Sequence, residues 1–421
     1  MHELKKMLVA ALPAPILSAY HFLLATLAAL LARFPSRYII VVGVTGTKGK
    51  SSTIEFLNAI FEAAGWKTAL SSTIRFKVGD ESRPNLKRMT VPGRFFIQNF
   101  LARAVDANCQ IAFIELTSES ARQHRHRFID LDALLFVNLA PEHIESHGSL
   151  QAYSDAKFEL GKQLARSRKR PRYIVANAED PESGRYLTLP VEHILPFSLA
   201  AATPYEARER GGFFTLAGER MEIALPGAFS LKNALAAATL ANAMRIPLHT
   251  IRMGLAQLTR IPGRAEEIDE GQGFTVVVDY AHTPDSLRAI YGAYPRRKIC
   301  VIGATGGGRD TWKRPVMGAV AEAACDTVIL TNEDPYDEDP HAIVEMLASG
   351  MKEKKPEIIM DRREAIRRGL SLARPNEVVL ITGKGTDPTM QGPRGSSVPW
   401  SDAGVAREEL RRLLGTKPTS A

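Results

Sequence analysis

A short segment from Val41 to Thr53, VVGVTGTKGKSST, has the residue types of a phosphate-binding loop. Gly46 and Gly49 allow backbone N–H groups to face an anion, and a helix that begins near Ser51 would add its positive end. The spacing departs from the common G-x-x-x-x-G-K-[ST] pattern because Gly43 comes one residue too early. The functional groups still fit a triphosphate with Mg²⁺. The alternative is a glycine-rich turn with an incidental lysine, which the flanking strand and helix patterns disfavour.

The predicted loop residues divide by the group that each would supply. Lys50 can reach the β- and γ-phosphates, and the hydroxyl of Ser51 or Ser52 can meet Mg²⁺. We predict that the whole segment binds nucleotide, through Gly46, Thr47, Lys48, Gly49, Lys50, Ser51 and Ser52.

The elements around this loop predict an α/β fold. Residues 38–45 form a β-branched run typical of a buried strand, and apolar residues at helical spacing follow the loop. Strand and helix patterns then alternate along the chain, which favours a parallel sheet covered by helices. Polar clusters follow nearly every strand, at the edge where ligands of such sheets gather.

Chain length and a proline–glycine junction divide the molecule. A chain of 421 residues is too long for one ordinary core. RIPGRAEEI at 260–268 follows a helix pattern, and the strand–helix alternation restarts after it. We expect an apolar helix segment at 1–37, a central ATP-binding domain of P-loop type with a parallel-rich sheet at 38–261, and a C-terminal Rossmann-like α/β domain at 262–421.

The net charge and the cysteine positions restrict the kinds of partner and the compartment that we expect for this protein. The net charge is +8, but no basic stripe interleaves with aromatic residues, so we expect no nucleic-acid partner. Nucleotides, phosphorylated sugars or an anionic membrane surface fit this charge better. Cys109, Cys300 and Cys325 lie far apart in apolar runs without metal spacing, so we expect buried thiols in a reducing compartment.

Residues 16–34, ILSAYHFLLATLAALLARF, are apolar almost throughout. Two interpretations stay open: a helix packed on the body or in a dimer, and an anchor on or across a membrane. Basic residues on both flanks give no clear orientation. No small-residue cleavage site is evident, so a signal peptide is not expected. We expect a cytoplasmic protein, with membrane association as the alternative.

The loop variant T-G-T-K-G-K-S-S resembles the ATP loop of the Mur ligase family and of folylpolyglutamate synthetases. The resemblance continues in order from Ile39 to the C-terminus and is strongest to the muramyl-tripeptide synthetase branch. It implies an ATP- and Mg²⁺-dependent ligase: ATP converts a carboxylate to an acyl phosphate, an amino group attacks, and an amide forms. The usual N-terminal UDP-binding domain of that branch is missing here, since 37 residues are too few to build it.

The resemblance also implies a metal site and a catalytic set. In ELTSES, Glu115 matches a Mg²⁺-binding glutamate, although Glu119 stands where the family usually has histidine. In NLAPEHIESHGSLQAYSDAKFEL, His143 matches a Mg²⁺ ligand and Lys157 a lysine that is carbamylated. We expect Ser51 or Ser52 and Glu115 to hold one Mg²⁺, and His143 and the carbamylated Lys157 to hold the other. The implied catalytic residues are Lys50, Glu115, His143, Lys157 and Arg264.

Further matched positions imply nucleotide contacts in both domains. The strings NAEDPES, GAFSLKNALAA, IPGRAEEI and VVDYAHTPDSL resemble family segments, with Ser230 in place of one asparagine. The positions implied to bind nucleotide outside the loop are Asn177, Asn233, Arg264, Asp279, Tyr280 and His282.

The acceptor and the incoming amine are less defined. The substrate positions that the resemblance implies are Thr90, Arg309, Asp310, Glu333, Asp334, Tyr336 and Asp387. Tyr336 replaces the arginine that reads the second carboxylate of diaminopimelate in other members. Tyrosine cannot form that bidentate pair, so we predict against diaminopimelate. Acidic Asp387 keeps a cationic amine possible.

Three functions stay open. The first is a ligase that adds an amino acid to a peptidoglycan-precursor-like acceptor. The second is the same chemistry on a folate, polyglutamate-like or lipid-linked acceptor. The third is a nucleotide-binding scaffold without activity, which the retention of Lys50, Glu115, His143 and Lys157 disfavours. The sequence leaves the acceptor, the amino acid and the oligomeric state undetermined.

Overall fold

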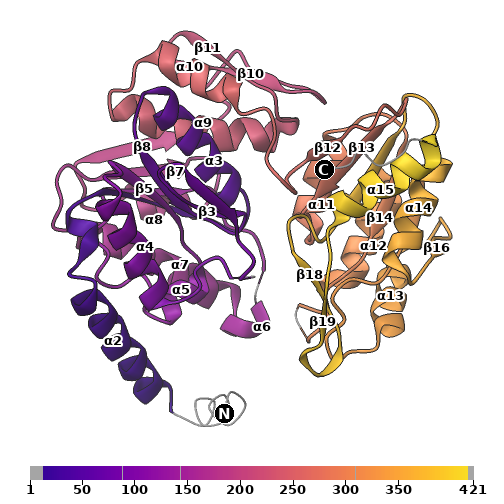
Figure 1. Ribbon diagram of the computed structural model, residues 1–421, viewed down its shortest axis with the longest axis horizontal. Helices are drawn as coiled ribbons and strands as arrows, with labels where there is room; N and C mark the ends of the chain where they lie inside the picture. Colours follow the sequence, from indigo (N-terminus) through magenta and orange to yellow (C-terminus); the bar gives the residue numbers. More distant parts are fainter. Residues whose placement is uncertain (1–12, 88, 143, 309, 416–421) are drawn as a thin grey trace.

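The computed structural model describes residues 13–87, 89–142, 144–308 and 310–415. The chain forms two α/β lobes, one coloured indigo to pink and the other orange to yellow in Figure 1. Helix α2 (Ala14–Leu31) extends from the first lobe. The α/β fold class predicted from the sequence is confirmed, while the exact domain boundaries stay a prediction.

The first lobe is built on an eight-stranded sheet of order β4-β3-β2-β5-β1-β6-β7-β8. Its central strands are parallel, and only β3 and β4 pair antiparallel. The central strands are nearly continuous apolar runs because both faces are covered. The strands are β1 (Ile40–Thr45), β2 (Thr68–Ser71), β3 (Arg75–Val78), β4 (Glu81–Pro84), β5 (Ile111–Glu115), β6 (Ala133–Phe136), β7 (Tyr173–Asn177) and β8 (His193–Phe197).

Two cores flank this sheet because side chains along a strand alternate between its faces. Val42 and Val44 join the core under α3, α9 and α10, whereas Val41 joins the core under α4, α7 and α8. A small sheet of β9 (Glu206–Ala207), β10 (Gly212–Leu216) and β11 (Glu219–Ile223) packs against α9 and α10. The helices are α3 (Lys50–Ala63), α4 (Arg94–Asp106), α5 (Ser118–Arg122), α6 (Ile144–His147), α7 (Leu150–Ala165), α8 (Ser183–Leu187), α9 (Gly227–Ala243) and α10 (Leu248–Gln257).

The second lobe has a six-stranded sheet of order β12-β13-β17-β14-β15-β16, parallel except for β12. Helices α11, α12 and α13 cover one face, and α14 and α15 cover the other. The strands are β12 (Glu266–Ile268), β13 (Thr275–Asp279), β14 (Lys298–Ile302), β15 (Thr327–Leu330), β16 (Glu357–Ile358) and β17 (Val378–Thr382), with a hairpin of β18 (Thr389–Gln391) and β19 (Ser397–Pro399). The helices are α11 (Pro284–Gly292), α12 (Lys313–Ala324), α13 (Pro340–Ser349), α14 (Arg362–Leu372) and α15 (Asp402–Leu414).

The expectation of three free thiols is wrong. Cys300 and Cys325 form a disulfide, whereas Cys109 is free and buried. Cys300 lies on β14, and Cys325 ends α12 just before β15. Because β14 and β15 are neighbours, the crossover through α12 returns the second cysteine to the first, with their Cα atoms 6.1 Å apart. A separation of 25 residues gave no sign of this pairing.

Helix α2 coincides with the apolar segment predicted at 16–34. One face packs on the first lobe, where Ala25, Ala28 and Ala29 are buried. The short 3₁₀ turn η1 (Pro35–Arg37) then leads into β1. In the described ranges, none of the helices combines the length and apolar character needed to cross a membrane.

Candidate functional site

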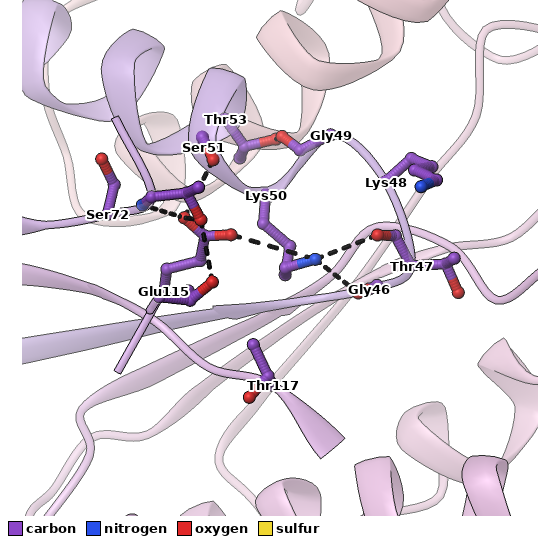
Figure 2. Close-up of polar contacts among 12 residues, drawn as sticks. Gly46, Thr47, Lys48, Gly49, Lys50, Ser51, Thr53, Ser72, Glu115 and Thr117 are labelled. Carbon is purple, nitrogen blue, oxygen red and sulfur yellow. Dashed lines mark hydrogen bonds and ion pairs between the residues drawn. The ribbon is translucent and has the colours of Figure 1, made fainter. Parts of the chain in front are cut away.

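The loop between β1 and α3 has the backbone geometry of an anion cradle (Figure 2). Asn138 fixes it: its side-chain oxygen accepts from the N–H groups of Thr47 and Lys48 at 3.1 and 2.9 Å. Gly49 has φ +83°, and a Cβ there would lie 2.3 Å from Oδ1 of Asn233. Glycine is therefore required at 49 both by the backbone conformation and by the close approach of Asn233.

Lys50 and Ser51 point from the start of α3 toward the end of β5 (Figure 2). Lys50 Nζ donates to the carbonyls of Gly46 and Thr47, each at 3.0 Å, and lies 3.9 Å from Oε1 of Glu115. Ser51 Oγ donates to Oε2 of Glu115 at 2.9 Å. The predicted phosphate-binding lysine, the hydroxyl and the carboxylate thus lie together.

Lys157 approaches the same loop from α7. It is buried, and its Nζ donates to the Gly46 carbonyl at 2.8 Å and lies 4.7 Å above the Tyr153 ring. Burial, aided by the positive charge of Lys50, holds the pKa of Lys157 well below its usual value. Two lysines therefore share one carbonyl oxygen.

The predicted metal set is partly assembled. Ser51 and Glu115 are in contact, and Lys157 lies on the other side of Gly46. His143 lies outside the described residues. Among the residues that the structure describes, no three His, Cys, Asp or Glu side chains form a metal cluster. The predicted set would rely on a hydroxyl and a modified lysine instead, and such oxygen donors suit a hard cation such as Mg²⁺.

A cavity of about 160 Å³ adjoins the loop and is lined by both lobes. Its lining includes five of the six nucleotide positions predicted outside the loop, namely Asn177, Asn233, Arg264, Asp279 and Tyr280. The guanidinium of Arg264 lies 4.5 Å from the Tyr280 ring centroid. Asp279 accepts from the N–H groups of Ala265 and Ala281 at 2.6 and 2.7 Å, so it also orders the junction between the lobes.

Sequence reasoning missed part of this lining. Phe229 and Lys232, beside Asn233 on α9, line the cavity, and so do Asn138 and Ser286. Asn138 stands in the string NLAPEH, just after β6, where a polar residue at a strand end was the available signal. Phe229 and Lys232 gave no such signal, because aromatic residues and lysines are common on helices that bind no ligand.

A second cavity, of about 400 Å³, continues from the loop between the lobes. Here Lys48 Nζ lies 2.9 Å from Oε1 of Glu142 and 3.0 Å from Nε2 of His282. The Nδ1 of His282 is 2.6 Å from the Tyr280 carbonyl, so it carries a proton, and Nε2 lies 3.0 Å from both Lys48 Nζ and Oε1 of Glu142. Burial lowers the pKa of His282 to about 4 and that of Lys48 to about 8, consistent with a neutral imidazole. This contact joins the two lobes.

Three acidic residues predicted to bind substrate line the same cavity, but a lysine that was not predicted contacts two of them. Glu333, Asp334 and Asp387 all line it. The fully buried Lys384 donates to Asp334 at 2.7 Å and lies 3.4 Å from Asp387. Two of the three acids therefore already contact the protein's own lysine, whose single charge offsets one of them, and sequence reasoning did not include this lysine.

Glu333 is the remaining acid. It is buried; one oxygen accepts from Thr305 at 3.0 Å, and the other has no hydrogen-bond partner among the described residues. Burial raises its pKa to about 6. Gly383 has φ +115°, and a Cβ there would lie 1.9 Å from that free oxygen. This oxygen is therefore unpaired but buried, and the missing side chain of Gly383 leaves it room.

The remaining substrate positions lie around this cavity. Thr90 Oγ1 contacts Thr73 Oγ1 at 2.9 Å, which links it to the Glu115 side. Asp310, Asp334 and Tyr336 line the cavity with φ values of 43°, 38° and 54°, unusual for non-glycine residues. Such backbone conformations cluster at functional sites. Arg309 lies outside the described residues.

Comparison with known proteins identifies the family. The Mur ligase middle domain matches residues 44–241, and the Mur ligase glutamate ligase domain matches residues 263–385. The chain is 35% identical over 393 residues to a UDP-N-acetylmuramoyl-L-alanyl-D-glutamate–2,6-diaminopimelate ligase of Geobacillus kaustophilus, covering 90% of this chain and 80% of that protein. It is 34% identical over 418 residues to a UDP-N-acetylmuramyl-tripeptide synthetase of Roseiflexus sp., covering 93% and 82%.

Solved structures of ligases share the fold of this chain. A UDP-N-acetylmuramoyl-L-alanyl-D-glutamate–2,6-diaminopimelate ligase superposes with a TM-score of 0.60 at 26% identity, over 89% of this chain and 79% of that one. A folylpolyglutamate synthase of Mycobacterium tuberculosis shares the fold, with a TM-score of 0.69 at 17% identity over 94% of each chain. The chain belongs to the Mur ligase family. It is an ATP-dependent ligase of the acid–amino-acid type, as the sequence predicted.

Replacing Lys50 tests the loop. We expect Lys50→Ala to lower ATP turnover by roughly two to four decades, because it removes a positive charge aimed at the transferring phosphate. ADP release measures the effect. Exposed Lys355→Ala serves as the matched control and should leave the rate unchanged. Near-normal turnover in Lys50→Ala would refute the assigned role.

Proposed function

We propose that the protein joins an amino acid to a carboxylate of a muramyl-peptide-type acceptor, using MgATP. The observation that carries this proposal is one shared cavity. Loop residues Lys48 to Ser51, the acceptor position Thr90 and the acidic residue Glu333 all line it. Phosphate donor, acceptor and amine can therefore meet in one place.

The reaction balances in two steps. A carboxylate oxygen of the acceptor attacks the γ-phosphorus, the bond to the β-phosphate oxygen breaks, and ADP leaves. The neutral amine nitrogen then attacks the acyl carbon, phosphate leaves and the amine gives up a proton. Lys50 offsets charge on the transferring phosphoryl group, and Arg264 lies within reach of the same cavity. Closure of the two lobes would keep water from the acyl phosphate.

Mg²⁺ is the expected cofactor. Ser51 and Glu115 would hold one ion, and His143 and a carbamylated Lys157 would hold the other. When bound, Mg²⁺ offsets charge on the phosphate oxygens. The relatives' dependence on ATP supports the metal in general terms, and these ligands are our proposal for this chain.

We propose that Lys157 carries a carbamate. The ammonium group would first lose a proton. The neutral nitrogen would then attack carbon dioxide and lose a second proton, so that a cation becomes an anion. The surroundings support this: Lys157 is buried at the Gly46 carbonyl, which Lys50 also contacts, and Lys48 comes from the same loop. An anion there would offset the lysines around it.

Lys157→Ala should therefore be nearly inactive, and a short carboxylate such as acetate should partly restore activity because it supplies the missing anion. Depletion of bicarbonate should slow the unchanged protein. Lys162→Ala, on the same helix but paired with Glu159 near the surface, is the control. If both the substitution and bicarbonate depletion leave the rate unchanged, the carbamate proposal is wrong.

Glu333 is our candidate for the amine's cationic end, because Asp334 and Asp387 contact Lys384. Tyr336 stands where the family resemblance places an arginine, so we propose an amine other than diaminopimelate, although several relatives are named for it. A lysine-like amine has a cationic end that can pair with the Glu333 carboxylate. The second carboxylate of diaminopimelate would not pair with it.

The pH dependence tests Glu333. Its pKa of about 6 means that it is charged above that pH and neutral below it. We expect kcat/KM for the amine to fall about tenfold per pH unit below that value, since only the carboxylate attracts the ammonium group. Glu333→Gln should have a lower kcat/KM at high pH and should lack the decrease below pH 6. Exposed Glu353→Gln should keep that decrease. An unchanged profile in Glu333→Gln would remove Glu333 from amine binding.

The proposal as a whole is tested by ADP release with MgATP over pairs of acceptors and amines. The acceptors are UDP-muramyl dipeptide, its lipid-linked and UDP-free forms, and a folate; the amines are lysine, ornithine and diaminopimelate. Release that requires one acceptor and one amine together supports the ligase and identifies its substrates. Nucleotide binding without release for any pair would favour the inactive scaffold. We place the reaction in the cytoplasm, where ATP is available.

A further inference from the structure

Helix α2 carries an apolar face that the first lobe leaves uncovered. Its members are exposed leucine and isoleucine side chains: Ile16 (54% exposed), Leu23 (66%), Leu27 (46%), Leu30 (56%) and Leu31 (69%). Their spacing places them on one side of the helix. We call these five residues the leucine face. A contiguous apolar face of this kind marks an interaction surface.

The opposite side of α2 is firmly held. Ser18 Oγ is 2.8 Å from Nε2 of His124, and Arg94 is 2.9 Å from Nδ1 of His21. The rings of Phe22 and Phe128 lie 5.5 Å apart. These contacts fix the orientation of the helix on the lobe, so the exposed leucine face points away from the lobe.

Charge around α2 indicates what covers this face. The helix contains no Asp, Glu, Lys or Arg. Arg33 and Arg37 follow it and are exposed, and Lys5 and Lys6 precede it in the sequence. Apolar side chains beside the exposed Arg33 and Arg37 match an anionic lipid surface, where the leucines enter the acyl boundary and the two arginines meet the headgroups.

A second copy of the chain fits less well. Parallel pairing of two leucine faces would place the basic ends of one helix beside the same ends of the other. That arrangement brings like charges together on a chain whose net charge is already +8.

We propose that the leucine face docks the protein on an anionic bilayer, with α2 lying in the plane of the surface rather than crossing it. Docking also positions the acceptor side of the site. Arg94, which contacts α2, begins α4 directly after the segment of Thr90. Arg94 also donates to the carbonyl of Gln123. Two residues further on, Arg125 donates to the carbonyl of Val91, next to Thr90.

Vesicle flotation of the full chain tests this proposal. We expect the protein to float with phosphatidylglycerol-containing vesicles at least about tenfold more than with phosphatidylcholine vesicles, and raised salt should weaken the binding. The triple variant Leu23→Ser, Leu27→Ser, Leu30→Ser should lose about tenfold or more of the bound fraction. The control is Leu150→Ser with Leu413→Ser, whose leucines are also exposed but lie on other helices.

The results of these experiments distinguish a lipid surface from a second copy of the chain as the partner of the leucine face. Size-exclusion chromatography and a thermal melt of each variant establish that it is folded. A folded wild-type chain that floats with neither vesicle overturns the proposal, and so does a triple variant that floats as well as wild type. A dimer that the triple variant dissociates, without vesicle binding, would assign the face to a second copy. These readouts do not use ligase activity, so failure of the proposed function would leave them intact.

Discussion

Two lysines converge on one carbonyl oxygen, and much of the site depends on how their charge is balanced. Lys50 and Lys157 both donate to the Gly46 carbonyl, at 3.0 and 2.8 Å. Buried positive charge is costly unless an anion accompanies it. Glu115 supplies one negative group at 3.9 Å from Lys50. The phosphates of a bound nucleotide supply more, which explains why this centre favours an anionic ligand.

The second lobe completes that centre. Lys48 reaches across to His282, and Glu142 accepts from Lys48 within the first lobe. Glu145 on α6 also accepts from the N–H groups of Asp310 and Thr311 in the second lobe. These contacts hold the lobes together over the cavity. The arrangement places the phosphate loop and Glu333 at different parts of one space, as a reaction between three substrates requires.

Much of the fold could be predicted from the sequence, because buried parallel strands are β-branched runs and each ends in a polar cluster. The loop from Gly46 to Ser52 was found in the same way, whereas its partner Glu115 was predicted from the family resemblance. The disulfide was missed because Cys300 and Cys325 meet only through the α12 crossover. Lys384 was missed because a lysine in a glycine-rich turn does not reveal that it contacts Asp334 and Asp387. Packing, rather than local pattern, decides such pairings.

The central claim is that the acceptor carboxylate is activated by phosphorylation before the amine attacks. The most direct measurement uses an acceptor whose reacting carboxylate carries ¹⁸O, with mass analysis of the phosphate released during amide formation. The account predicts that one labelled oxygen passes from the carboxylate to phosphate, because the acyl–oxygen bond breaks when the amine attacks. Amide formation with unlabelled phosphate would contradict the acyl phosphate route and the arrangement of the site argued from it.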